Sequence, residues 1–141
     1  MNPRRSRAPW PFAAAALWSL LFAAPHTWWA LGVPLGFPGG REAHQFMLGS
    51  SWRYAYLVVV TLLSFLGAVV AIVLAGGRSA STVTRIFIGL AWAAAGMLLL
   101  RGVAGMIADG RSDPVWWPTF TLGGVLFGLV AWRSRRQAAR V

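Results

Sequence analysis

The stretch YAYLVVVTLLSFLGAVVAIVLA, residues 54–75, decides the fold because it contains no Asp, Glu, Lys or Arg. A helix needs about 20 consecutive apolar residues to cross the hydrocarbon core of a bilayer, and this run meets that length. It is followed by Gly76, Gly77 and Arg78, a helix stop and then a basic residue of the kind found at the cytoplasmic face of a membrane. The stretch therefore predicts a membrane-spanning helix.

Three further segments have the same character. Residues 11–32 and 114–132 carry no charged side chain, and residues 86–108 carry only Arg101. Tryptophans gather near the predicted span ends, where indole rings favour the headgroup level: Trp10, Trp28, Trp29, Trp52, Trp116, Trp117 and Trp132. The sequence thus predicts an all-α fold, an integral membrane four-helix bundle in a single transmembrane domain. Residues 33–53 are expected to form its one long outer loop.

Composition supports a membrane protein. Of the 141 residues, 57% are hydrophobic and 11% are charged, against roughly a quarter charged in soluble domains. The net charge of +10 comes entirely from arginine and would be typical of a nucleic-acid-binding protein. Here the arginines lie between long apolar runs, so we expect the lipid bilayer as partner and no nucleic acid. The absence of Cys excludes disulfides, thiolate metal sites and iron–sulfur clusters.

The distribution of arginine predicts the orientation. An even number of spans places both termini and the connection 76–85 on one side. That side carries no acid and holds Arg4, Arg5, Arg7, Arg78, Arg85, Arg133, Arg135, Arg136 and Arg140. The other side holds fewer arginines and every acid, so both termini are predicted to be cytoplasmic, in a multi-pass protein of the cytoplasmic (inner) membrane. The first apolar run could be a cleaved signal peptide, but its continuation to Leu31 favours a retained span.

His26 and Arg101 are the two polar side chains expected within the outer third of the bilayer. Each lies 15 residues after the start of a span that runs outward, about 22 Å along the helix at 1.5 Å per residue. Equal depth predicts that both side chains face one small, outward-facing polar chamber. The alternatives stay open: His26 can be a hydrogen-bonded packing residue, and Arg101 can extend to the lipid headgroups.

Several other side chains are candidates for the same region. Trp18, Phe22, His26 and Trp29 follow helical spacing along one stripe, and Pro25 frees the carbonyl of Leu21 as an acceptor for the imidazole. Gly102 and Gly105 allow a neighbouring backbone or a ligand to approach closely. The predicted ligand-binding residues are His26, Trp29, Arg101, Asp109, Tyr54, Glu42 and His44. Packing, helix capping and a disordered outer loop remain the alternatives.

The segment His26-Thr27-Trp28-Trp29-Ala30-Leu31-Gly32, with Arg101-Gly102 late in the third span, resembles a bacterial family of small four-span membrane proteins. That family is a domain of unknown function with a His-x-x-Trp-Ala-Leu-Gly signature. The resemblance implies that His26, Trp29, Gly32 and Arg101 form a family feature. It implies no activity, substrate or cofactor.

Most catalytic chemistries lack the residues they need. Two His and three acids in scattered positions do not supply a zinc site, so no metal is expected. A bis-histidine haem would require the loop to bring His44 back to His26. There is no phosphate-binding glycine loop and no carboxylate inside a span for proton coupling. Any cofactor remains open.

These observations favour a non-catalytic function. We expect the outward-facing pocket to bind a small or lipidic ligand, or the chain to be an accessory subunit of a membrane-protein partner or a homo-oligomer. The alternative is a membrane-embedded enzyme with His26 as acid/base and Arg101 holding an anionic group. A small oligomeric transporter is the third possibility.

Overall fold

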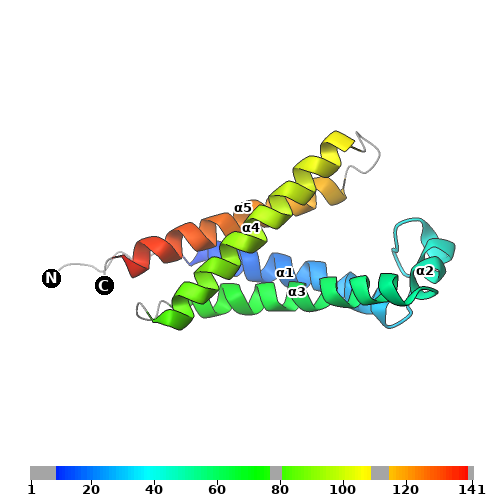
Figure 1. The fold of residues 1–141 in the computed structure, drawn as a ribbon, viewed down its shortest axis with the longest axis horizontal. Helices are drawn as coiled ribbons and strands as arrows, with labels where there is room; N and C mark the ends of the chain where they lie inside the picture. Colours follow the sequence, from blue (N-terminus) through cyan, green and yellow to red (C-terminus); the bar gives the residue numbers. More distant parts are fainter. Residues whose placement is uncertain (1–8, 77–80, 109–114, 140–141) are drawn as a thin grey trace.

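The protein is all-helical over the residues that its computed structural model describes, which are 9–76, 81–108 and 115–139. Five helices follow one another along the chain, and no strand occurs among those residues. The helices are α1 (Trp10–Ala30), α2 (Gly40–Leu48), α3 (Ser51–Ala75), α4 (Thr82–Ala108) and α5 (Trp116–Ala138) (Figure 1). The all-α prediction is confirmed.

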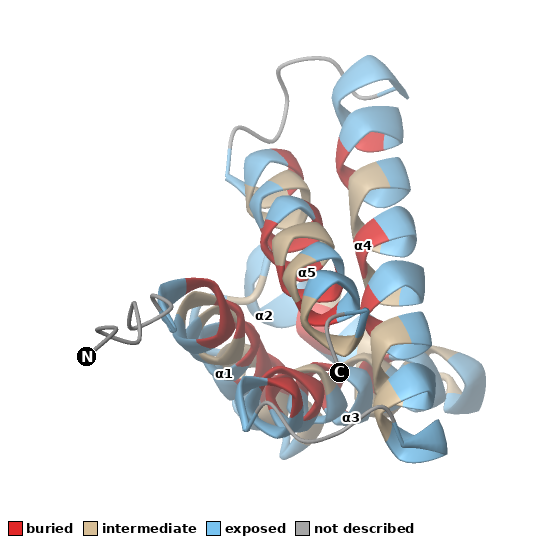
Figure 2. Ribbon diagram, turned by 90° about the vertical axis from the view of Figure 1, so that its left-hand side faces the viewer, coloured by how far each residue is buried: buried red, intermediate tan, exposed pale blue. Residues whose placement is uncertain are grey.

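The four long helices form two antiparallel pairs. α1 packs mainly on α3 and α4 mainly on α5, with fewer contacts between the pairs (Figures 1 and 2). The pairs meet where α1 begins and α5 ends, and they diverge towards the opposite end of the molecule (Figure 1). We call this opposite end, which holds the last turns of α1 and α4 and the first turns of α3 and α5, the splayed end.

Each predicted span is found as a helix, with shifted ends. Among the described residues, α3 and α4 are long and apolar enough to cross a membrane. Helices α1 and α5 do not reach the same hydropathy, because α1 contains Pro25, His26 and four tryptophans and α5 ends with three arginines. Length and composition therefore support two membrane-spanning candidates directly.

The outer connection differs from the predicted loop 33–53. It contains the nine-residue helix α2, and α3 begins at Ser51 rather than at residue 54. Gly39 and Gly40 have φ of +80° and +77°, a left-handed conformation that reverses the chain into α2. Ser50 is extended, with φ −131° and ψ 123°, and separates α2 from α3. A helix this short is marginal alone, so its stability must come from contacts with the rest of the chain.

The four-helix core occupies only the half of the molecule opposite the splayed end. Small and branched aliphatic residues and two phenylalanines from all four long helices meet there: Phe12 and Ala15 from α1, Val70, Ala71 and Leu74 from α3, Ala91 and Ala95 from α4, and Leu126, Phe127, Val130 and Ala131 from α5. These residues lie in the first half of α1, in α4 up to its middle, in the second half of α3 and in α5 from its middle onward. Beyond this core each pair packs largely by itself.

Glycines allow α4 and α5 to approach closely. A Cβ atom added at Gly105 would lie 2.3 Å from the ring of Trp117, and one at Gly124 would lie 2.6 Å from the side chain of Leu99. At Gly102 it would lie 2.3 Å from the hydroxyl of Thr121. Because the neighbours are a buried ring and helix backbone, they have little room to move. Only glycine fits at these positions without displacing one helix from the other.

The substitution Gly105→Ala tests this contact. The added methyl group would overlap the buried indole of Trp117, so we expect the free energy of unfolding to fall by about 1–3 kcal/mol. The matched control is Gly96→Ala, on the same helix, where a Cβ atom meets nothing within 4 Å. Thermal unfolding of both variants in detergent measures the difference; equal midpoints would show that the α4–α5 contact is not tight.

Candidate functional site

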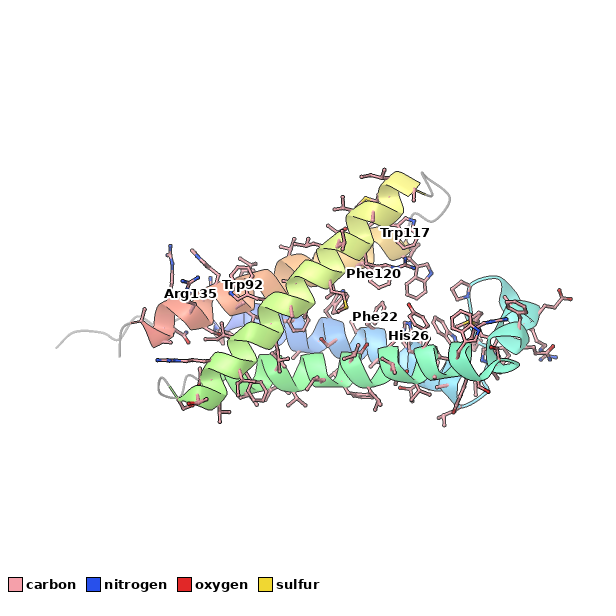
Figure 3. The ribbon with its side chains drawn as sticks, in the orientation of Figure 1. Phe22, His26, Trp92, Trp117, Phe120 and Arg135 are labelled. Carbon is pink, nitrogen blue, oxygen red and sulfur yellow. The ribbon has the colours of Figure 1, made fainter. Side chains whose placement is uncertain are left out.

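Aromatic rings replace aliphatic residues towards the splayed end. Six side chains form what we call the aromatic cluster: Phe22, His26 and Trp29 from α1, and Trp116, Trp117 and Phe120 from α5. In Figure 3, Phe22 and His26 of α1 lie on the side that faces Phe120 and Trp117 of α5. The cluster therefore lies at the junction of the two helix pairs.

Helical spacing along α1 places its share of these rings. Trp18 and Phe22 stack with centroids 5.2 Å apart, and Phe22 and His26 stack at 4.4 Å. The ring of His26 is then 4.8 Å from that of Trp29. The predicted aromatic stripe is confirmed. Trp18 also donates its indole N–H to the carbonyl of Thr119 at 3.2 Å, which ties α1 to α5.

His26 is buried and oriented by its own helix. Its Nδ1–H donates to the carbonyl of Phe22 at 2.7 Å. The predicted acceptor, the carbonyl of Leu21 that Pro25 frees, is not used. Phe22 is four residues earlier and lies on the same helix face as His26, whereas Leu21 lies on a different face and is 65% exposed. With Nδ1 as donor, Nε2 of the neutral ring is an acceptor that can face the cluster.

His44 has a structural task. Its Nε2–H donates to the carbonyl of Trp29 at 2.8 Å, in the last turn of α1, and this carbonyl also accepts from the backbone N–H of Gly32 at 3.1 Å. Trp29 in turn donates its indole N–H to the carbonyl of Leu35 at 2.9 Å. The ring of Phe37 lies 5.0 Å from Trp29 and 5.1 Å from His44. His44 thus fixes α2 against the end of α1, which favours packing over ligand binding.

Arg101 reaches the cluster from α4. Its Cζ atom lies 5.0 Å from the ring centroid of Trp117 and 6.0 Å from that of Phe120. Phe120 contacts Phe22 at 5.4 Å, and Phe22 stacks on His26. His26 and Arg101 thus contact different members of the aromatic cluster and share no hydrogen bond, and a polar chamber common to both stays a prediction. The two polar groups contact the same cluster at different places.

The other predicted residues do not join this cluster. Tyr54 is exposed near the start of α3, and Glu42 is exposed in the first turn of α2. Neither side chain has a hydrogen-bond or ring partner among the described residues. Asp109 lies outside the described residues. Within the described part of the chain, no group of three or more His, Asp or Glu side chains is placed to hold a metal ion.

Trp117 is the functional candidate that sequence reasoning missed. It is only 8% exposed, and its indole N–H has no hydrogen-bond acceptor among the described residues. The ring of Trp117 lies against Gly105 of α4, where a Cβ atom would overlap the ring carbons. The indole can therefore be buried at this place only because residue 105 is a glycine. The spacing of Gly102 and Gly105 had predicted a close approach on this face of α4, and Trp117 and Thr121 of α5 make it.

No family model, curated protein or solved structure matches this chain. The resemblance to a four-span family through His26, Trp29, Gly32 and Arg101 stays a prediction. Function must be inferred from the arrangement of the residues themselves.

The substitution His44→Ala tests the anchoring of α2. Loss of the buried hydrogen bond to the Trp29 carbonyl should lower the free energy of unfolding by about 1–3 kcal/mol. It should also accelerate amide hydrogen exchange in α2 more than in α3. Gln45→Ala, at the exposed neighbouring position, serves as control and should change neither. Unchanged exchange in His44→Ala would mean that other contacts hold α2 in place.

Proposed function

We propose that the chain is a four-span integral protein of the cytoplasmic membrane and that it binds a small or lipidic ligand at the aromatic cluster, without catalysing a reaction. In this proposal both termini are cytoplasmic and the splayed end faces outward. An accessory role in a complex with another membrane protein, or in a homo-oligomer, is compatible with the same site.

The exposed surface supports the membrane assignment. Large apolar side chains point away from the bundle on both candidate spans, among them Leu62 at 61% and Ile72 at 61% on α3 and Leu100 at 71% on α4. In water such a surface would favour aggregation, whereas lipid tails accommodate it. Helices α1 and α5, with 21 and 23 residues, are about 32 and 35 Å long and can span a hydrocarbon core of about 30 Å.

The described charges support the orientation. Four described arginines lie at the end of the molecule opposite the splayed end: Arg85 at the start of α4, and Arg133, Arg135 and Arg136 at the end of α5. No acid occurs among the described residues of that arginine-rich end. The single described acid, Glu42, belongs to α2 at the splayed end. The splayed end also holds Arg41, Arg53 and Arg101, so the described charges are four arginines without an acid at one end and three arginines with one acid at the other. By the positive-inside rule this difference supports a cytoplasmic position for the end with four arginines.

Accessibility of introduced cysteines tests this topology cleanly, because the chain has none of its own. In intact cells, a membrane-impermeant maleimide should label Gln45→Cys in α2 and should not label Ala139→Cys after α5 until the membrane is permeabilised. Both positions are exposed in the structure. Labelling of both from outside, or of Ala139→Cys alone, would contradict the proposed orientation.

The observation that carries the binding proposal is the change of lining along the bundle. The mostly aliphatic core ends about halfway along the bundle. The half towards the splayed end holds aromatic rings together with one imidazole and one guanidinium. Sites for small ligands are built in this way, from apolar and aromatic walls with a few polar groups that fix orientation. A ligand with an apolar body and a polar group fits these surroundings.

The same geometry argues for binding over the two alternatives. An enzyme with His26 as acid/base would need Arg101 to hold a substrate group near the imidazole, but the contacts of Arg101 are with the rings of Trp117 and Phe120. A proton-coupled transporter uses a carboxylate inside the membrane, and the described parts of the four long helices contain none.

Substitution of Phe120 tests the binding proposal. The protein is purified in mild detergent, and co-purified lipids and small molecules are extracted and identified by mass spectrometry. Phe120 contacts rings of both helices and Arg101, so Phe120→Ala should reduce retained ligand severalfold. The control is Phe65→Ala on α3, which removes a ring that is 42% exposed on the outside of the bundle. Equal retention in both variants and the wild type would refute the site.

A further inference from the structure

Two hydrogen-bond donors at the α4–α5 contact have no acceptor. The indole N–H of Trp117 is buried without a partner. Arg101 is exposed, and its guanidinium, with five N–H donors, makes no hydrogen bond or ion pair with any described residue. A buried donor without an acceptor, as the Trp117 N–H is among the described residues, is uncommon in folded proteins and calls for an explanation such as a ligand.

The two donors are held near each other. The Cζ atom of Arg101 lies 5.0 Å from the centroid of the Trp117 ring, and Gly105 holds that ring against α4. Both groups donate and neither accepts, and the guanidinium carries a full positive charge. The complementary ligand therefore offers several acceptor oxygens and a negative charge, as a phosphate group does.

Position along the helix indicates where such a phosphate would come from. Arg101 lies seven residues before the end of α4, about 10 Å along the axis, which is close to the boundary between acyl chains and headgroups in the proposed topology. Its helix neighbours Leu100 and Ile107 are 71% and 78% exposed, as expected for contact with lipid. The half-buried ring of Phe120, whose centroid is 6.0 Å from the Arg101 Cζ atom, continues from Arg101 as an apolar surface on which an acyl chain can lie, and the buried Phe22 supports it from behind.

We infer that Arg101 and Trp117 bind the phosphate of an anionic phospholipid in the outer leaflet, with its acyl chain against Phe120. The inference rests on the proposed function and names the ligand class for that site. An anionic lipid is preferred over a zwitterionic one because the Arg101 charge has no described counter-charge, and a choline group would bring a second positive charge beside it.

Lipid-resolved native mass spectrometry of the full-length protein tests the inference. Phosphatidylglycerol and phosphatidylcholine with identical acyl chains are added to the purified protein in detergent. The wild type should bind phosphatidylglycerol more tightly, and Arg101→Gln should lose roughly tenfold or more in that affinity with little change for phosphatidylcholine. Arg101→Lys keeps the charge and should retain most of the preference. Trp117→Phe keeps a ring beside Gly105, removes the N–H and should weaken phosphatidylglycerol binding by a smaller factor.

The control is Arg136→Gln, which removes an arginine that lies 3.9 Å above the ring of Trp132 at the opposite end of α5. This variant should keep the preference of the wild type. If Arg101→Gln keeps it as well, or if the wild type shows none, the inference is wrong while lipid retention at Phe120 can still stand. If inorganic phosphate alone displaces phosphatidylglycerol, the site belongs to a soluble anion and the lipid assignment is overturned. If no lipid of either kind is retained, the inference is wrong and the lipidic form of the proposed function fails with it, which leaves a small molecule as the ligand.

Discussion

The difference in size between alanine and aromatic side chains sets the shape of this molecule. Where α1 begins and α5 ends, Ala15, Ala71, Ala91, Ala95 and Ala131 are completely or almost completely buried and let all four long helices meet. Towards the splayed end, rings from α1 and α5 fill the junction, and α4 stays with α5 alone. In the proposed membrane setting, where lipid leaves no hydrophobic driving force between helices, such close packing of small residues would hold the spans together.

The two histidines show how one residue type serves two purposes at the same end of the molecule. His44 donates to a carbonyl on another helix and so fixes the short helix α2, which would not be stable alone. His26 donates to a carbonyl of its own helix, and its other ring nitrogen remains an acceptor within the aromatic cluster. Trp29 connects them, because its carbonyl accepts from His44 while its ring lies 4.8 Å from that of His26.

Much of the fold could be predicted from the sequence, because long uncharged runs and their flanking arginines are local signals. The helix over residues 54–75 and the aromatic stripe of α1 needed no knowledge of neighbours. Helix α2 could not be predicted, since its stability depends on a contact between His44 and Trp29, 15 residues apart. The relation of His26 to Arg101 could be predicted only in part, for a similar reason. Helical rise gives depth along an axis, but the direction in which each helix faces depends on packing.

Arg101 joins the packing of the bundle to its proposed function. An arginine in the outer third of a span costs up to about 3 kcal/mol unless it is paired or reaches the headgroups. Its contact with the Trp117 ring offsets part of that cost, about 0.5–2 kcal/mol for a cation above an indole. The ring lies there because Gly105 allows α5 to approach α4. Gly105 thus allows α4 and α5 to pack closely and also places the Trp117 indole beside the Arg101 charge. The N–H groups of both side chains then still lack a hydrogen-bond acceptor among the described residues. An acceptor supplied from the surrounding lipid would complete the contact without any change in how the helices pack.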